Sequence, residues 1–228
     1  MSTGANVLQR PGSMGWLVLG DCHFHLSTED PVVQRMLQLV DPARQVLMLE
    51  AGPALGTGAD FSEWISELIG QPLVRLDPAA ENVVQIREAW LNAGLIFLIG
   101  DRQDRWREFI GEWLFQGYPE EILADSSLMI ASGMSAGAMG TWMLERSGGD
   151  LVGGLGWLEG GVILPGEGQP SSESAVLELL EGMEPAYALG LPEASRLALG
   201  PNGEVEVWSD ISPAIVLGRG WIDAETGA

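Results

Sequence analysis

The sequence predicts an α/β protein with a doubly wound, mostly parallel sheet flanked by helices, and with antiparallel strands in the C-terminal third. Three observations predict this class. Short, uninterrupted apolar runs are typical of strands that are buried on both faces. They alternate with longer segments whose apolar residues recur at helical spacing. Near the C-terminus the apolar runs become short and are separated by Gly, Pro and Asn, which indicates antiparallel hairpins.

The strands are expected where apolar runs are bounded by Gly or polar turn residues. In the first two thirds they cover residues 15–20, 45–51, 73–76, 95–99 and 128–132. The run 95–99 is entirely apolar and leads into the polar segment Gly-Asp-Arg-Gln at 100–103. In the C-terminal third, hairpin strands are expected at 187–191, 196–200, 204–208 and 215–219.

Helices are expected between these strands. The first carries Val33, Met36, Leu37 and Val40 on one face, and Asp41-Pro42 ends it. The second begins near Asp60, whose side chain is predicted to cap it. Further helices are predicted at 81–93, around 106–114, from the turn after residue 132 to about 146, and at 172–183.

Length and composition favour one domain that spans residues 1–228. A chain of 228 residues with 46% hydrophobic content can bury a sizeable core. No apolar run approaches the roughly 20 residues of a membrane span, and residues 1–10 lack the order of a secretory signal. We therefore expect a cytoplasmic protein. The single cysteine, Cys22, excludes an intrachain disulfide and a Cys-rich zinc site.

The charge is strongly acidic, with 32 acidic residues, 11 basic residues and a formal net charge of −21. Nucleic acid is not an expected partner, because phosphate binding requires a basic surface, and we expect no membrane partner. All basic residues are arginine, which excludes a lysine Schiff base and a Walker-type phosphate lysine. The acidic residues are spread along the chain, as in a solvated surface; an acidic docking site for a cationic ligand is the alternative.

The segment from Gly133 to Gly137 has the Gly-x-Ser-x-Gly pattern of a nucleophile elbow. Such an elbow is a sharp strand-to-helix turn, and small residues beside the serine leave space for its strained backbone. We therefore predict that Ser135 occupies the strained turn at the carboxyl edge of the sheet. An ordinary Gly-rich loop is the alternative interpretation.

Four segments in the same order resemble the serine peptidase family of cyanophycinase and dipeptidase E, whose fold is class I glutamine amidotransferase-like. They are Leu-Val-Leu-Gly at 17–20, Ile-Phe-Leu-Ile-Gly-Asp-Arg-Gln at 96–103, Gly-Met-Ser-Ala-Gly-Ala at 133–138, and Tyr-Ala-Leu-Gly-Leu-Pro-Glu-Ala-Ser-Arg-Leu at 187–197. The third is similar to the family's nucleophile motif. The second is similar to its strand ending in Gly-Gly-Asp/Asn-Gln.

The resemblance implies a catalytic site around Ser135 as nucleophile. The N–H of Ala136, together with an N–H at Gly100 or Asp101, would form an oxyanion hole. Glu193 matches an acidic residue that lines the cyanophycinase-type site, and a hairpin-surface carboxylate is the alternative.

Two further side chains, those of Gln103 and Glu167, are expected to contact substrate. If Glu167 and Glu193 both face Ser135, the site should favour a cationic or amine-bearing ligand.

The expected general base is missing. The family places its histidine just beyond the strand after the elbow helix, and residues 161–169 contain none. The second glycine of the oxyanion turn is replaced by Asp101. The chain's only imidazoles belong to His23 and His25, just past the first strand, where a relocated base could reach Ser135 and Asp21 could orient it.

Surface-loop histidines are the alternative interpretation of these two residues. A metal site that includes Asp21 and Cys22 lacks any established ligand spacing. We expect neither a metal nor a cofactor.

Two functions therefore remain open from the sequence. The first is a serine hydrolase that acts on a small peptide or amide bond through Ser135. The second is a catalytically inactive relative that binds a small molecule or a protein partner in the same cleft. Nine tryptophans are compatible with an apolar homodimer face.

Overall fold

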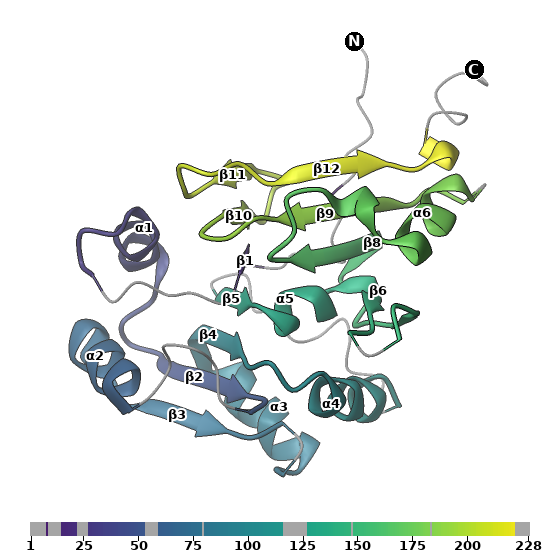
Figure 1. Ribbon diagram of the computed structural model, residues 1–228. Helices are drawn as coiled ribbons and strands as arrows, with labels where there is room; N and C mark the ends of the chain where they lie inside the picture. The colour runs from purple at the N-terminus through teal and green to yellow at the C-terminus, as the bar shows by residue number, and fades with distance from the viewer. Residues whose placement is uncertain are drawn as a thin grey trace.

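The chain folds into two β-sheets with helices packed on their faces (Figure 1). The structure is a computed structural model that describes residues 8, 15–21, 27–52, 59–78, 80–115, 127–146, 148–182 and 184–221. No helix within these ranges is long and apolar enough to cross a membrane.

The larger sheet has seven strands in the order β11-β10-β1-β5-β4-β2-β3. Their bounds are β1 Trp16–Gly20, β2 Gln45–Glu50, β3 Leu73–Leu76, β4 Ala93–Ile99, β5 Leu128–Ser132, β10 Arg196–Leu199 and β11 Val205–Val207. The five strands from β1 to β3 in this order pair in parallel, and β10 and β11 extend the sheet antiparallel to β1. The predicted fold class is therefore confirmed.

Helices cover both faces of the larger sheet. On one face lie α1 (Pro31–Leu39) and α2 (Ala59–Ile69), and on the other lie α3 (Val83–Asn92) and α4 (Gln103–Phe115). The side chains of Asp30 and Asn82 accept backbone N–H groups at the starts of α1 and α3, as N-caps do. Helix α2 begins at Ala59, and the predicted cap by the Asp60 side chain concerns a side chain outside the described ones.

A second sheet was not foreseen from the sequence. It has the order β12-β9-β8-β6-β7, with β6 Gly140–Leu144, β7 Leu151–Gly153, β8 Leu158–Pro165, β9 Tyr187–Leu191 and β12 Ala214–Leu217. The helix predicted to run to about 146 is wrong, because α5 covers only Met134–Ala138 and strand β6 follows. A Cβ at Gly140 would lie 2.4 Å from the carbonyl oxygen of Gly161, so glycine permits the close approach of β6 to β8.

One predicted hairpin is also wrong. Strands β9 and β10 follow each other in the chain but lie in different sheets, and β9 pairs with β8 in parallel and with β12 antiparallel. The β10–β11 hairpin is confirmed. Helix α6 (Ser174–Glu181) lies on the outer face of the second sheet, where Val176 and Leu180 pack against Val162 and Ala188.

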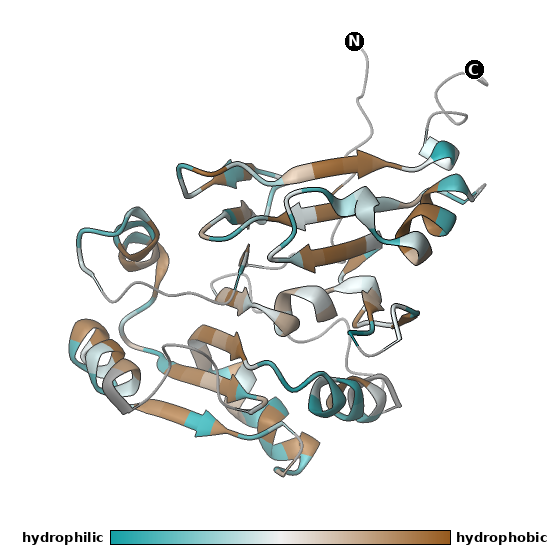
Figure 2. Ribbon diagram, in the orientation of Figure 1, coloured by the Kyte–Doolittle hydropathy of each residue, from teal (hydrophilic) through white to brown (hydrophobic). Residues whose placement is uncertain are grey.

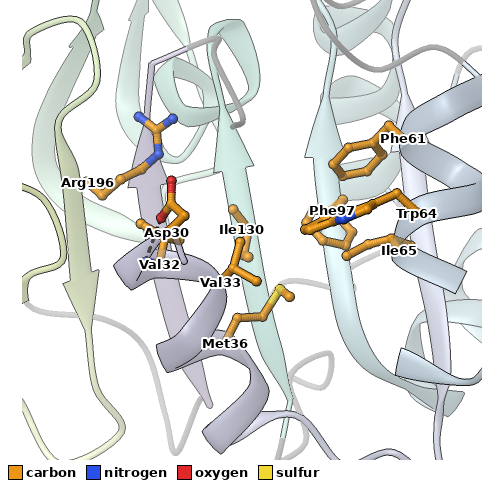
Figure 3. A pocket seen from close by; sticks show the side chains of 10 residues that line it. All are labelled: Asp30, Val32, Val33, Met36, Phe61, Trp64, Ile65, Phe97, Ile130 and Arg196. Atoms are coloured by element: carbon orange, nitrogen blue, oxygen red, sulfur yellow. Dashed lines mark hydrogen bonds between the residues drawn. The ribbon is translucent and has the colours of Figure 1, made fainter. Parts of the chain in front are cut away.

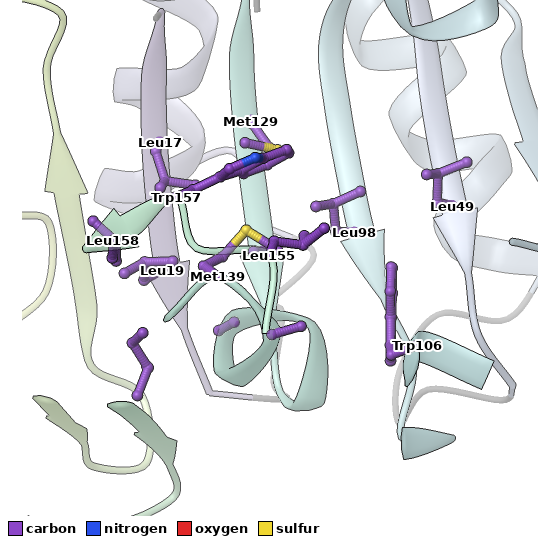
Figure 4. Packing of buried hydrophobic residues seen from close by; sticks show 14 of the residues in the cluster. Leu17, Leu19, Leu49, Leu98, Trp106, Met129, Met139, Leu155, Trp157 and Leu158 are labelled. Atoms are coloured by element: carbon purple, nitrogen blue, oxygen red, sulfur yellow. The ribbon is translucent and has the colours of Figure 1, made fainter. Parts of the chain in front are cut away.

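A continuous core joins the two sheets. It contains buried side chains from β1, β4 and β5 of the larger sheet and from β8 and β9 of the second. Figure 4 shows Trp157 beside Leu17 and Met129, and the ring of Trp157 also meets Trp90 edge-on at 5.7 Å between centroids. In Figure 2 the strands β2, β3, β4, β8 and β12 are mostly brown, and α4 is largely teal on the side in view.

Tyr187, at the start of β9, lies in this core and is fully buried. Burial raises the pKa of its phenol. A Cβ at Gly161 would lie 2.6 Å from the hydroxyl oxygen of Tyr187, so the glycine leaves the space that the ring occupies. The aromatic side chain of β9 is therefore fitted against the backbone of β8, its parallel neighbour.

Candidate active site

The predicted strand-to-helix turn is present at the carboxyl end of β5. Strand β5 ends at Ser132, Gly133 follows with φ 66° and ψ −132°, and α5 begins at Met134. The N–H of Gly133 donates to the carbonyl of Gly20 at the end of β1 (3.1 Å), which fixes the turn to the neighbouring strand. A backbone with this positive φ is accessible to glycine and strained for other residues.

Ser135 does not occupy the strained position, so the prediction that placed it there is wrong. It is the second residue of α5, and Gly133, which has no side chain, stands at the turn. Only Met134 separates the two positions. The Gly-x-Ser-x-Gly pattern therefore identified the right turn but not the residue at its apex.

The hydroxyl of Ser135 points into the protein. The residue has no exposed surface, and its Oγ accepts the N–H of Ser132 at 2.9 Å. The same Oγ lies 2.5 Å from the carbonyl oxygen of Leu98 on β4 and 2.9 Å from that of Ser132. Because a hydroxyl has one proton, it donates to one of these carbonyls at a time. The side chain thus ties α5 to the ends of β4 and β5.

A buried ion pair lies next to the turn, and the sequence did not indicate it. Arg196 at the start of β10 approaches Asp21 with 2.6 Å between Nη1 and Oδ1, and both side chains are almost completely buried. Arg196 also donates to the carbonyl of Ser195 at 2.7 Å. Ser132 Oγ donates to the carbonyl of Asp21. Because 175 residues separate the two charges in sequence, no local pattern could have revealed their pairing.

Two residues expected in the oxyanion hole lie at the end of β4. Gly100 has φ 126°, and a Cβ there would lie 2.4 Å from the carbonyl oxygen of Ala51 at the end of β2. Asp101 is exposed, and its carbonyl accepts the N–H of Gln103 at 3.1 Å. The third, Ala136, is fully buried within α5. Their role as oxyanion donors stays a prediction.

The amide of Gln103, a predicted substrate contact, is bonded to the backbone. Its Nε2 donates to the carbonyl of Leu144 at 2.7 Å, and its Oε1 accepts the N–H of Arg146 at 3.0 Å. Both ends of the amide therefore hold the end of β6 against α4. In this arrangement Gln103 has a structural role and does not present its amide to a ligand.

Glu167 and Glu193 lie at the same edge of the second sheet. Each stands two residues beyond the paired strand ends Pro165 of β8 and Leu191 of β9. Glu167 is half-buried and Glu193 is exposed, and neither carboxylate has a hydrogen-bond or ion-pair partner among the described residues. A Cβ at Gly137 in α5 would lie 3.7 Å from the ring of Pro165, so the end of β8 lies beside the elbow helix.

The chain's two imidazoles, those of His23 and His25, lie outside the described residues, as does Cys22. Within the described ranges, no three His, Cys, Asp or Glu side chains are grouped as they would be to hold a metal ion. The relocated-base hypothesis therefore stays a prediction.

A small crevice opens between α1 and α2 over the larger sheet (Figure 3). Its floor is apolar, with Val33 and Met36 on α1 and Phe97 and Ile130 on the sheet, and Arg196 lies at one end. The space measures about 20 Å³, which is room for about one water molecule. A crevice of this size is too small for an organic ligand.

A larger, charged crevice of about 340 Å³ lies at the carboxyl ends of β2 and β3. Arg75 forms an ion pair with Glu50 across it, and Arg105 forms one with Asp77. On the same edge of the sheet, a hydrogen bond from Arg102 lowers the pKa of the exposed Asp104 carboxyl to about 2. The charged groups of this crevice are therefore already paired with each other.

Comparison with known proteins supports the fold. No protein-family model matches the sequence, and no curated protein matches it. A crystal structure of a peptidase from an acI-B1 actinobacterium matches with a TM-score of 0.52 and 15% identity, over 92% of this chain and 97% of that one.

A second crystal structure, from Listeria monocytogenes EGD-e and described as a peptidase E, gives similar values. It matches with a TM-score of 0.55 and 12% identity, over 87% of this chain and the whole of that one. At such identities the likeness concerns the fold alone. The chain therefore shares the α/β fold of peptidase E-like peptidases.

Proposed function

We propose that this chain is a non-hydrolytic protein with a peptidase E-like fold that binds a small, amine-bearing peptide or amide at the carboxyl edge of its sheets. The observation that carries the proposal is the inward hydroxyl of Ser135, which is completely buried and hydrogen-bonded to the backbone. The alternative is a serine hydrolase that uses Ser135 as its nucleophile.

Acyl transfer through Ser135 would need a different geometry. The Oγ must reach a substrate carbonyl carbon, and a general base must lie within hydrogen-bond reach of its proton. Here the carbonyls of Leu98 and Ser132 surround that proton, and they are backbone groups of the sheet interior. The residue at the turn itself is Gly133, which carries no nucleophile.

The first test removes the hydroxyl. Ser135→Ala should lower the free energy of unfolding by about 1–3 kcal/mol, because the N–H of Ser132 loses its buried acceptor. Replacing a strained catalytic serine commonly has the opposite effect on stability. Urea unfolding of both proteins gives the difference.

A fluorophosphonate probe tests directly whether Ser135 acts as a nucleophile. The wild-type protein should show no labelling of Ser135 between pH 5 and 9, a range chosen around the ordinary imidazole pKa of about 6.5. Rapid labelling that rises with imidazole deprotonation, and that either His23→Ala or His25→Ala abolishes, would establish the hydrolase instead.

The choice of ligand depends on charge. Glu167 and Glu193 stand side by side at the ends of β8 and β9 without a cationic partner among the described residues, and the chain carries a formal net charge of −21. Two carboxylates at one edge of a sheet raise the local concentration of cations. A dipeptide that contains arginine supplies both an amine and a guanidinium group.

Thermal unfolding with dipeptides tests this choice. An arginine-containing dipeptide at about 100 times its Kd should stabilise the protein by about 2.7 kcal/mol, which raises Tm by roughly 5–10 °C for a chain of this size. An aspartyl dipeptide should give no shift. Glu167→Gln and Glu193→Gln should each reduce the shift. Equal shifts with both dipeptides would contradict the assignment.

A further inference from the structure

The second sheet carries a cavity at the end opposite to Glu167 and Glu193. It lies where β6, β8 and β9 begin and β12 ends. Its volume is about 480 Å³, within the range of small-molecule sites. The cavity is lined by Thr141, Trp142, Glu159, Gly160, Glu184, Pro185 and Trp221.

An irregularity in strand pairing shapes one wall of the cavity. Gly140 of β6 pairs with Leu158 of β8, but Trp142, two residues later, pairs with Val162, four residues later. The extra residues of β8 include Glu159 and Gly160. Bulges of this kind redirect side chains and are frequent at binding sites.

The bulge is held in place by specific contacts. Thr141 Oγ1 accepts the N–H of Gly160 at 3.0 Å. Gly160 has φ 70°, and a Cβ there would lie 2.7 Å from the carbonyl oxygen of Pro185. Glycine therefore allows the bulge to approach the segment before β9. This contact brings Glu159 and Glu184 to the same cavity.

The opposite wall is formed by the segment that follows β12. The N–H of Gly218 donates to the carbonyl of Ala186 at 2.8 Å, and the N–H of Trp221 donates back to the carbonyl of Gly218 at 3.1 Å. This turn returns Trp221 toward Glu184 and Pro185. The indole Nε1 of Trp221 is buried and has no hydrogen-bond acceptor in the described part of the chain.

From this lining we infer that the cavity binds a small organic cation of the quaternary or alkylated ammonium class. It offers two indole rings, and the faces of tryptophan rings attract cations more strongly than those of other aromatic side chains. It also offers the carboxylates of Glu159 and Glu184, which are exposed and have no ion-pair partner among the described residues. No arginine lines it.

The cavity is separate from the site proposed at Glu167 and Glu193. Strand β8 has eight residues, so its two ends lie about 23 Å apart at roughly 3.3 Å per residue. Alkylated ammonium groups also differ from the free amine of a dipeptide. Their charge is spread over methyl groups, and these pack against the faces of aromatic rings. Variants at one end should leave binding at the other end unchanged.

Choline and its uncharged isostere 3,3-dimethylbutan-1-ol are the probes. Isothermal titration of the full chain should show saturable binding of choline, at least about 10-fold tighter than binding of the alcohol, because the two differ in charge and hardly in shape. Affinity for choline should fall as salt is raised, since the carboxylates are exposed. Equal binding of the two compounds, or no saturation by choline, would overturn the inference.

Variants then locate the site. The double variant Glu159→Gln/Glu184→Gln should weaken choline binding by about 5-fold or more, and Trp221→Leu should weaken it by a similar factor. Circular dichroism and Tm establish that each variant is folded. The control Glu193→Gln, at the other end of the sheet, should bind choline as the wild type does. Unchanged affinity in the folded double variant, or an equal loss in the control, would refute this location.

Discussion

Replacing Arg196 with methionine should lower the free energy of unfolding by about 3–5 kcal/mol, because the change leaves the carboxylate of Asp21 buried without its cation. The side chains of Arg196 and Asp21 are 6% and 2% exposed, so water cannot replace the missing partner. A Cβ at Gly20 would lie 2.6 Å from Cδ of Arg196, which shows how closely the β1 backbone encloses the guanidinium stem. Urea titration with an unchanged m-value measures the effect.

Two further variants test the physical reason. Arg107→Met breaks an ion pair with Glu145 that is 49% exposed on the arginine side, and it should change stability by less than about 1 kcal/mol. The double variant Asp21→Asn/Arg196→Met removes both buried charges and should recover part of the loss. A loss below 1 kcal/mol in Arg196→Met would mean that the pair is not buried in solution.

The parallel part of the fold could be predicted because its strands are buried on both faces. Residues 95–99 and 128–132 are almost wholly apolar, and the structure has them as the central strands β4 and β5. Residues 140–144 gave no such signal. Their sequence, Gly-Thr-Trp-Met-Leu, continues from a helical turn without a residue that clearly ends the helix. Its strand conformation depends on pairing with β7 and β8.

The Gly-x-Ser-x-Gly pattern predicted the turn after β5 but not which residue occupies it. The pattern correctly indicated a strand, a turn of small residues and a helix. It could not distinguish Gly133 from Ser135 as the turn residue, because the two lie only two positions apart between the same strand and helix. The deciding factor is the positive φ at the turn, which glycine adopts without strain.

The buried ion pair between Asp21 and Arg196 could not be predicted from the sequence, and the reason differs from that at the elbow. Asp21 and Arg196 each look in sequence like ordinary polar residues at a strand end. They meet because β10 pairs antiparallel with β1, in a register that places Arg196 opposite Gly20. Contacts that depend on long-range register leave no local pattern.

Gly100→Ala should destabilise the protein by about 3 kcal/mol or more, through backbone strain and steric overlap together. The added Cβ would lie 2.4 Å from the carbonyl oxygen and 2.6 Å from the carbonyl carbon of Ala51. Ala51 cannot easily move away. Its N–H donates to Ile99 at 2.9 Å, and its carbonyl accepts the N–H of Arg102 at 3.0 Å.

Two other glycines separate the two contributions. Gly70 has φ 75° but open space around its Cβ position, so Gly70→Ala should show backbone strain alone, about 1 kcal/mol. Gly111 lies inside α4 with open space, and Gly111→Ala should stabilise the helix by about 0.5–1 kcal/mol. If Gly100→Ala cost no more than Gly70→Ala, the ends of β2 and β4 would not be in contact in solution. The crevice at the carboxyl ends of β2 and β3, and the predicted oxyanion residues Gly100 and Asp101, would then be arranged differently from this structure.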